Sequence, residues 1–219
     1  MRNSARNVIC ISQLLAFYIC WNSLSFAQIR NDDGLIWKKE NKLNWSYYLG
    51  SPKIRSEHAA ISFCQLDFVP TIINDTLKCR IVARLIKSKS WVNPKFMSET
   101  GLNHEQGHFD IEEIYARLFR KKISEFKFSK NNYKKNLDIL YNSIGEELNN
   151  KHQEYDIETN FSNDTLKQYE WTRKIAIQLD KLKDFEHPEV FTIMKINSEE
   201  VLSPLRSYTK RTIKIYFLF

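Results

Sequence analysis

His104-Glu105-Gln106-Gly107-His108, within the longer stretch Leu102–Asp110, places two histidines four residues apart with a glutamate beside the first. On an α-helix, residues four apart lie on the same face, so both imidazoles can reach one metal ion. The carboxylate of Glu105 then lies where it can take a proton from a metal-bound water. This is the His-Glu-x-x-His arrangement of zinc hydrolases, in which two histidines hold Zn²⁺ and the glutamate is the general base.

The residues around this motif predict a long helix. Ser98 is a suitable N-cap, and a helix from Glu99 to about Phe126 follows. Its apolar residues recur at helical spacing: Ile111, Ile114, Tyr115, Leu118, Phe119 and Ile123. Both histidines fall at one end of this stripe, so we expect them to be buried. Asp110 and Glu112 either orient a ligand histidine by accepting its second hydrogen bond or only keep the helix soluble.

Strand signals precede this helix and helical signals follow it. Two strand-like segments, 59–66 and 77–86, flank a predicted turn at Asn74-Asp75. Further helices are expected at about 133–151 and 165–184, and a strand is possible at 213–219. This order predicts an α+β fold, in which a small antiparallel sheet is followed by a helical, zincin-like core that holds the metal site.

The N-terminus resembles a secretory signal peptide. Arg2 and Arg6 precede a largely apolar run from Val8 to Trp21, and Ser25-Phe26-Ala27 offers small residues for cleavage before Gln28. The run is short for a membrane span. We therefore expect three parts: a signal peptide at 1–27, a zincin-like metallopeptidase domain at 28–185 and a C-terminal tail at 186–219. The expected location is secreted or periplasmic, in a bacterial cell envelope.

Charge and cysteine content add two expectations. Cleavage removes two arginines and no acid, so the net charge falls from +7 to +5. The lysines are spread through the chain, which is typical of solvated helix faces, and nucleic-acid binding is not expected. The mature chain retains Cys64 and Cys79, which form either a disulfide across the predicted turn or two buried thiols. No membrane span is expected after cleavage.

A hydrolytic zinc site needs three protein ligands and an open position for water. His104 and His108 supply two. We expect the third from Asp156 or Glu158, which lie in the segment Tyr155–Thr159. The remaining alternatives are Glu146 and Glu147 on the second predicted helix, and the histidines His152 and His187. Tyr155 either donates a hydrogen bond to an oxyanion or packs as an ordinary aromatic residue.

The motif and its flanks resemble the domain-of-unknown-function 922 family, exported bacterial proteins described as predicted secreted zinc-dependent proteases. The core of the likeness is His104–Asp110, read as His-Glu-Gln-Gly-His-Phe-Asp. Weaker similarity is found in three other segments: Leu43–Pro52, Ser88–Val92, and Tyr155–Thr159 with Gln168 and Trp171 after it. The family pattern commonly places a histidine where this chain has Phe161. If that histidine is the third ligand, this chain lacks it; a carboxylate ligand leaves the site intact.

Together these features predict an exported zinc-dependent peptidase. Glu105 is the expected general base, Zn²⁺ the expected cofactor, and a peptide or protein the expected substrate. The alternative is a non-catalytic zincin-like envelope protein that binds a partner or uses zinc structurally. The substrate and the oligomeric state do not follow from the sequence.

Overall fold

The structure is a computed structural model, and it describes residues 33–52, 59–194 and 211–216. Contacts divide the chain into residues 1–34 and residues 35–219. The second unit holds the fold described below. The predicted signal peptide, residues 1–27, lies outside the described residues.

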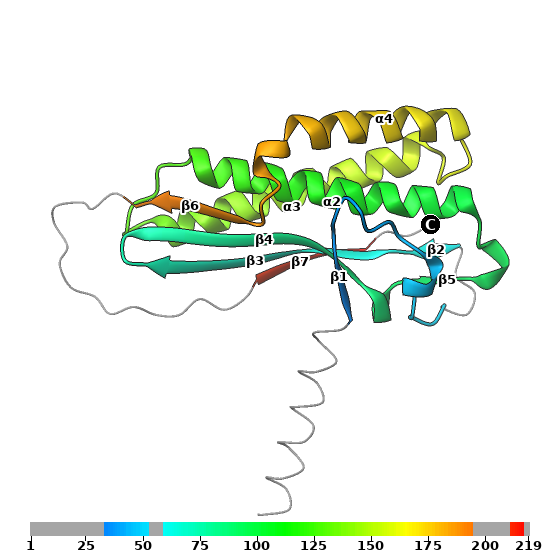
Figure 1. The fold of residues 1–219 in the computed structure, drawn as a ribbon, viewed down its shortest axis with the longest axis horizontal. Helices are drawn as coiled ribbons and strands as arrows, with labels where there is room; N and C mark the ends of the chain where they lie inside the picture. The colour runs from blue at the N-terminus through cyan, green and yellow to red at the C-terminus, as the bar shows by residue number, and fades with distance from the viewer. Residues whose placement is uncertain (1–32, 53–58, 195–210, 217–219) are drawn as a thin grey trace, which may run out of the picture. The chain divides into compact units, whose positions relative to one another are not determined.

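In the part of the chain that the structure describes, three α-helices lie on one face of an antiparallel sheet (Figure 1). The strands are β1 (Gly34–Ile36), β2 (Ala60–Ile61), β3 (Phe63–Ile73), β4 (Thr76–Ile86), β5 (Trp91–Val92), β6 (Glu189–Ile193) and β7 (Arg211–Tyr216). The helices are α2 (Glu99–Glu125), α3 (Tyr133–Glu158) and α4 (Thr165–Lys181). Short 3-10 helices are η1 (Trp45–Tyr47), η2 (Lys87–Lys89), η3 (Pro94–Phe96) and η4 (Lys183–Phe185). The predicted α+β class is confirmed.

The hairpin of β3 and β4 is the centre of the sheet. Its register pairs Ile73 with Thr76 across the predicted Asn74-Asp75 turn. Asn74 has φ of 55°, a left-handed conformation that asparagine tolerates better than most residues. The alternating pattern in β4 buries Leu77, Cys79 and Ile81 on one face. The predicted hairpin is therefore confirmed, but the segment 59–66 divides at Ser62 into β2, which belongs to another ribbon, and the start of β3, which continues to Ile73.

The C-terminal segment contributes two strands to the same sheet. β6 pairs with β4, and β7 pairs with β3, both antiparallel. The strand expected at 213–219 is thus present as far as Tyr216; residues 217–219 lie outside the described residues. β2 and β5 form a separate two-stranded ribbon, in which Ala60 faces Val92. This ribbon brings Ser62 towards the N-terminal half of α2.

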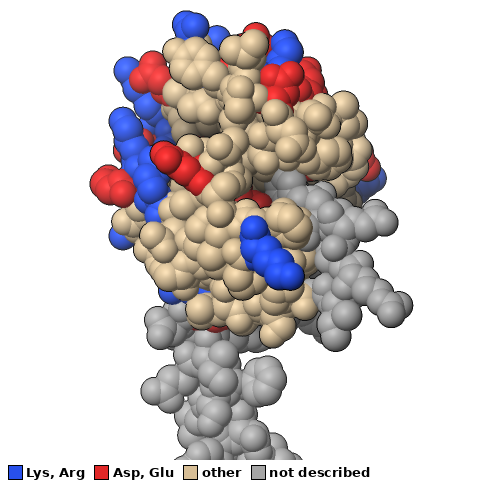
Figure 2. Space-filling model, turned by 90° about the vertical axis from the view of Figure 1, so that its right-hand side faces the viewer, with Lys and Arg blue, Asp and Glu red and all other residues tan. Residues whose placement is uncertain are grey.

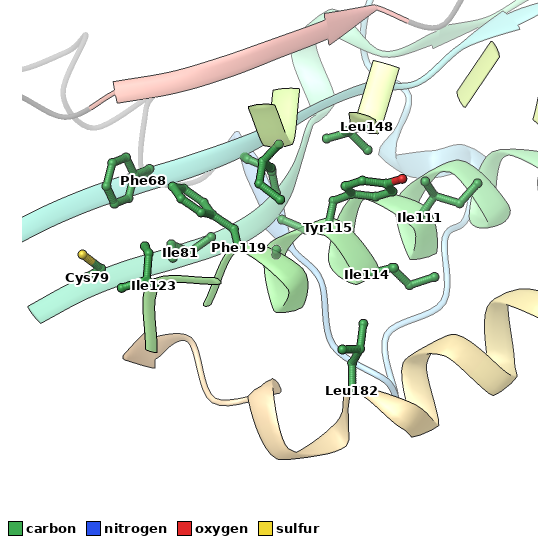
Figure 3. Packing of buried hydrophobic residues seen from close by; sticks show 14 of the residues in the cluster. Phe68, Cys79, Ile81, Ile111, Ile114, Tyr115, Phe119, Ile123, Leu148 and Leu182 are labelled. Carbon is green, nitrogen blue, oxygen red and sulfur yellow. The ribbon is translucent and has the colours of Figure 1, made fainter. Parts of the chain in front are cut away.

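α2 runs through the middle of the molecule, between the sheet and the other two helices. It packs against β3, β4 and β6 on one side and against α3 and α4 on the others. Figure 3 shows Phe119 and Ile123 of α2 beside Phe68, Cys79 and Ile81 of the sheet. Because α2 is covered on several sides, it buries polar as well as apolar residues, and the predicted single stripe understates its burial.

α3 is longer than predicted. It continues past Lys151 to Glu158, through a segment rich in acids. Asn160, Phe161 and Ser162 then all have positive φ, which ends the helix before α4 begins at its Asp164 cap. The extra turns carry His152, Asp156 and Glu158, so these residues have helical and not loop geometry.

Two remaining expectations concern the cysteines and the membrane. Cys64 and Cys79 are free and fully buried, and the register pairs them with Leu85 and Pro70. They are therefore thiols and not the alternative disulfide. Among the described helices, none has the length and apolar character that a bilayer crossing demands.

Candidate metal centre

The two motif histidines meet an aspartate from a neighbouring helix. His104 and His108 lie one turn apart on α2, and Asp156 faces them from α3. Asp156 Oδ1 is 3.2 Å from His104 Nε2 and 2.9 Å from His108 Nε2. All three residues are buried. Within the described ranges, these three residues are the one group of histidine, cysteine or acid side chains close enough to hold a metal ion.

The donor atoms have the separations that a shared ion requires. Ligands about 2.0–2.1 Å from a tetrahedral zinc lie roughly 3.3 Å from each other, close to the separations of Asp156 Oδ1 from the two imidazole nitrogens. Two neutral imidazoles and one carboxylate are also an ordinary donor set for a catalytic zinc, which leaves one position open. The residues therefore fit a divalent metal ion.

The other candidate ligands lie elsewhere. Glu158 follows Asp156 by two positions on the same helix, so it points away from the histidines. Its Oε2 accepts a hydrogen bond from Trp171 Nε1 and pairs with Lys174. Glu147 pairs with Lys122, and Glu146 is exposed.

His187 is exposed and bonds the backbone of Glu189. The group thus contains three of the four predicted ligands, His104, His108 and Asp156, and Glu158 lies outside it.

Glu105, the predicted base, is buried beside the group. Ser62 Oγ donates a short hydrogen bond to Glu105 Oε2, and Ser62 also bonds the Tyr48 hydroxyl at 2.7 Å. Burial raises the pKa of Glu105 from 4.5 to about 8, the Ser62 hydrogen bond opposes the rise, and the charge of Asp156 adds to it. A base with a pKa near neutrality is suited to exchanging protons at physiological pH. Ser62 and Tyr48 were not predicted, because they lie far from α2 in the sequence, after β2 and after η1, and reach Glu105 only through the tertiary fold.

Two side chains fix the ring of His104. Its Nδ1 donates to Gln168 Oε1 at 3.0 Å, which leaves Nε2 free of a proton and able to bind a metal. Tyr155 stacks on the His104 ring, with centroids 4.5 Å apart and planes 13° apart. The Tyr155 hydroxyl donates to the His104 carbonyl and accepts from Gln168 Nε2. Tyr155 thus packs beside the site, and its hydroxyl is engaged with the helix.

Gly107 explains how Tyr155 comes so close. A Cβ at position 107 would overlap the hydroxyl and ring of Tyr155. The glycine inside the motif therefore opens a notch in α2 that Tyr155 fills. This contact fixes how α3 packs on α2, and Asp156 is the next residue along α3.

A second pair of side chains lies behind His108. His108 Nδ1 is 3.0 Å from His152 Nδ1, and His152 Nε2 is 3.4 Å from Glu112 Oε2. Glu112 follows His108 by four residues on α2, and His152 precedes Asp156 by four on α3. This i, i+4 spacing places Glu112 on the same helix face as His108, and His152 on the same face as Asp156. The spacing that identified the motif could therefore have identified both residues. Burial lowers the pKa of His152 well below its ordinary value and raises that of Glu112 well above it.

Asp110 does not orient a ligand histidine. It accepts hydrogen bonds from Trp37 Nε1 and Gln106 Nε2, both at 2.7 Å. Gln106 in turn accepts from the backbone of Leu43. These two motif residues therefore hold the segment before η1 against α2. Of the two acids offered for the orienting role, Glu112 is the one that connects to a ligand.

The charges of the two key ionisable ligands are coupled. Burial lowers the pKa of His108 from 6.5 to about 4, although Asp156 opposes the change. Burial alone would raise the pKa of Asp156, but the two histidines outweigh it and the pKa is lowered. A neutral His108 imidazole beside a charged Asp156 carboxylate has the protonation state that metal binding requires.

The surface near the start of α2 is mostly uncharged. Figure 2 shows this end of the molecule: neutral side chains cover most of the described surface, basic side chains lie near the lower middle of the view, and further basic and acidic side chains are scattered around them. A separate groove of about 850 Å³ lies between α2 and α4, lined by Gln106, Asp110, Gln168 and Tyr169 among others. None of His104, Glu105, His108 and Asp156 lines this groove, so it is not the metal centre.

Fold and site define an α+β protein with a buried two-histidine, one-aspartate group suited to a metal ion. Residues 88–163 match the family model described as "Bacterial protein of unknown function (DUF922)", so the resemblance to that family is confirmed over this segment. The match contains the whole of α2 and α3, with all three residues of the group. Neither the curated proteins nor the solved structures contain a match to the chain.

The departure at Phe161 does not touch the group. Phe161 lies beyond the end of α3 and has 45% of its surface exposed. Asp156 brings the third donor atom to the two histidines without it. The chain therefore has three donors, although it has phenylalanine where the family commonly has histidine.

Proposed function

We propose that the protein is an exported, zinc-dependent peptidase. The observation that carries the proposal is the placement of Glu105: a buried carboxylate adjoins a group of three metal donors, on the helix that supplies two of them. Zinc, when bound by His104, His108 and Asp156, supplies a Lewis acid that lowers the pKa of water and polarises a carbonyl oxygen. Three protein donors suit a catalytic ion, whereas structural zinc usually has four.

The chain's own residues then carry the proton transfers. Glu105 takes a proton from the attacking water and returns it to the departing amine. Ser62 holds the Glu105 carboxylate by hydrogen bonding to Oε2, and Tyr48 holds Ser62. The mostly neutral surface in Figure 2 is better suited to a peptide backbone than to a polyanion such as nucleic acid.

The test compares two glutamine substitutions. Glu105→Gln keeps the size of the side chain but removes the base, so zinc should remain while hydrolysis of fluorescein-labelled casein falls by about 10²–10⁴-fold. Glu146→Gln, at an exposed position on α3, is the matched control and should hydrolyse like wild type. Full hydrolysis by Glu105→Gln would contradict the assignment of the base.

A structural or partner-binding role is the alternative, and the burial of all three donors is the observation that favours it. In that case the zinc-loaded wild type would hydrolyse none of the labelled casein. Glu105→Gln would then also match wild type in zinc content.

A further inference from the structure

We propose that Glu112 and His152 form a hydrogen-bond chain that fixes the tautomer and orientation of His108 as a metal ligand. The proposal rests on the metal centre proposed above, and not on peptidase activity. His152 is a positioning residue in this scheme, since it acts through His108 and contributes no donor atom to the group of three. Glu112 acts one step further out.

The direction of each hydrogen bond follows from the tautomer that His108 needs in order to bind a metal. To bind a metal, His108 Nε2 must carry no proton, so the proton of the neutral ring is on Nδ1. That N–H donates to His152 Nδ1, 3.0 Å away. His152 must then carry its own proton on Nε2, which faces Glu112 Oε2 at 3.4 Å. The carboxyl oxygen accepts this hydrogen bond. A single placement of the ring protons therefore gives every donor in the hydrogen-bond chain an acceptor.

Burial makes this arrangement consequential. His108 and Glu112 are fully buried, and His152 is 1% exposed, so water cannot replace a missing partner. The chain crosses between two helices: His108 and Glu112 belong to α2, while His152 belongs to α3 together with Asp156. It therefore connects one metal donor to the helix that supplies another. Loss of such outer partners typically weakens metal affinity by 10–100-fold.

A purely structural pair would behave differently. If Glu112 and His152 only fill the core, removing them would lower the stability of the metal-free protein and leave zinc affinity per folded molecule unchanged. The distinguishing measurement is therefore the zinc dissociation constant of the folded protein, obtained by competition with a chromophoric chelator.

The test uses a disruptive and a conservative variant at each position. His152→Leu removes the acceptor for His108 and should weaken zinc binding by about 10–100-fold. His152→Asn keeps an oxygen near the position of Nδ1 and should recover most of that loss. Glu112→Leu removes the second acceptor and should weaken binding less than His152→Leu does. Glu112→Gln keeps an acceptor and should bind zinc within about threefold of wild type.

The control is Ile144→Val, which shortens a fully buried side chain on α3 that takes no part in the hydrogen-bond chain. It should lower stability by about 0.5–1.5 kcal/mol and leave zinc affinity unchanged. Wild-type affinity in folded His152→Leu would overturn the proposal while leaving the metal centre intact. Absence of zinc binding by the wild type would overturn both.

A spectroscopic measurement on the unsubstituted protein remains informative if the leucine variants do not fold. Long-range ¹H–¹⁵N correlation spectra of the zinc-loaded protein report which nitrogen of each imidazole carries a proton. We expect His108 protonated on Nδ1 and His152 on Nε2. A His152 ring protonated on Nδ1 would contradict the proposed hydrogen-bond chain, because the Nδ1–H groups of His108 and His152 would then face each other.

Discussion

At the scale of single residues, Gly107 shows how one missing side chain organises the site. Its notch admits Tyr155, which stacks on His104 and precedes Asp156. Gly107→Ala should therefore displace Tyr155 and lower the free energy of unfolding by about 1–3 kcal/mol, despite the better helix propensity of alanine. Zinc affinity should fall as well, because Asp156 moves with Tyr155. Chemical denaturation and chelator competition measure the two effects.

Gly101→Ala is the matched control for this prediction. It lies in the same helix, and a Cβ there meets chiefly the Oγ of the N-cap residue Ser98, at 3.0 Å, with no overlap as close as that of position 107 with Tyr155. We expect a change in stability within about 1 kcal/mol and no change in zinc affinity. Equal effects of the two alanines would show that the notch has no special role.

Glu105 predicts how the stability of the metal-free protein depends on pH. Its pKa rises from 4.5 in the unfolded chain to about 8 in the fold. The folded state holds this proton more tightly, so the contribution of Glu105 to stability is complete below pH 4.5. It is lost as the pH rises towards 8, at up to about 1.4 kcal/mol per pH unit. Glu105→Gln should remove this loss, so the variant should be more stable than wild type at pH 8.

His108 works in the opposite direction. Its pKa falls from 6.5 to about 4, so its contribution is present above pH 6.5 and is lost as the pH falls towards 4. Between pH 4.5 and 6.5 the loss from Glu105 and the gain from His108 offset each other. Thermal unfolding in the presence of a chelator should therefore show the greatest stability in this pH range. The exposed Glu146→Gln variant should follow the wild-type curve. An unchanged alkaline loss in Glu105→Gln would contradict the shifted pKa.

At the scale of helices and strands, Arg120 connects three elements through buried hydrogen bonds. From α2, its Nε donates to the Ile81 carbonyl of β4 at 3.2 Å, and its Nη1 pairs with Glu113 at 3.1 Å. Nη1 also donates to the Phe185 carbonyl in η4, beyond α4. Arg120→Met should cost about 3–5 kcal/mol of stability, because Glu113 and the carbonyls lose a buried partner.

Arg173→Met, on the exposed side of α4, is the matched control and should change stability by less than about 0.5 kcal/mol. Equilibrium unfolding in urea compares the two. A small effect at Arg120 would mean that the surrounding contacts hold α2, β4 and η4 together without it.

At this scale, the sequence predicted features that depend on neighbouring residues better than contacts between residues far apart in the sequence. Local patterns sufficed for the metal-motif helix, the hairpin at Asn74-Asp75, and the pairing of His104 with His108. Asp156 could be placed only among several acids, because its approach to α2 depends on long-range packing. The predicted end of α3 at Lys151 also concealed that Asp156 and Glu158 face different sides of one helix. Ser62 carries no local signal, since it reaches the site from the break between β2 and β3. Gln168 was part of the family resemblance, but its contact with His104 depends on how α4 packs on α2.

At the scale of the whole molecule, export remains a prediction from the first 27 residues. The basic start, the apolar run and Ser25-Phe26-Ala27 favour cleavage after Ala27. Protein recovered from the envelope or medium of bacterial cells should therefore begin at Gln28 when its N-terminus is sequenced. A full-length chain beginning at Met1 and retained in the cytoplasm would contradict this prediction.

The proposed metal centre joins α2 to α3, and its occupancy can be measured without a substrate. Native mass spectrometry of the purified protein should show one zinc ion per chain. Asp156→Asn should lose that ion, and Glu158→Gln, two residues away on the same helix, should retain it, because only Asp156 lies against His104 and His108. Full zinc occupancy in Asp156→Asn, or a wild-type protein that binds no zinc, would contradict the metal centre.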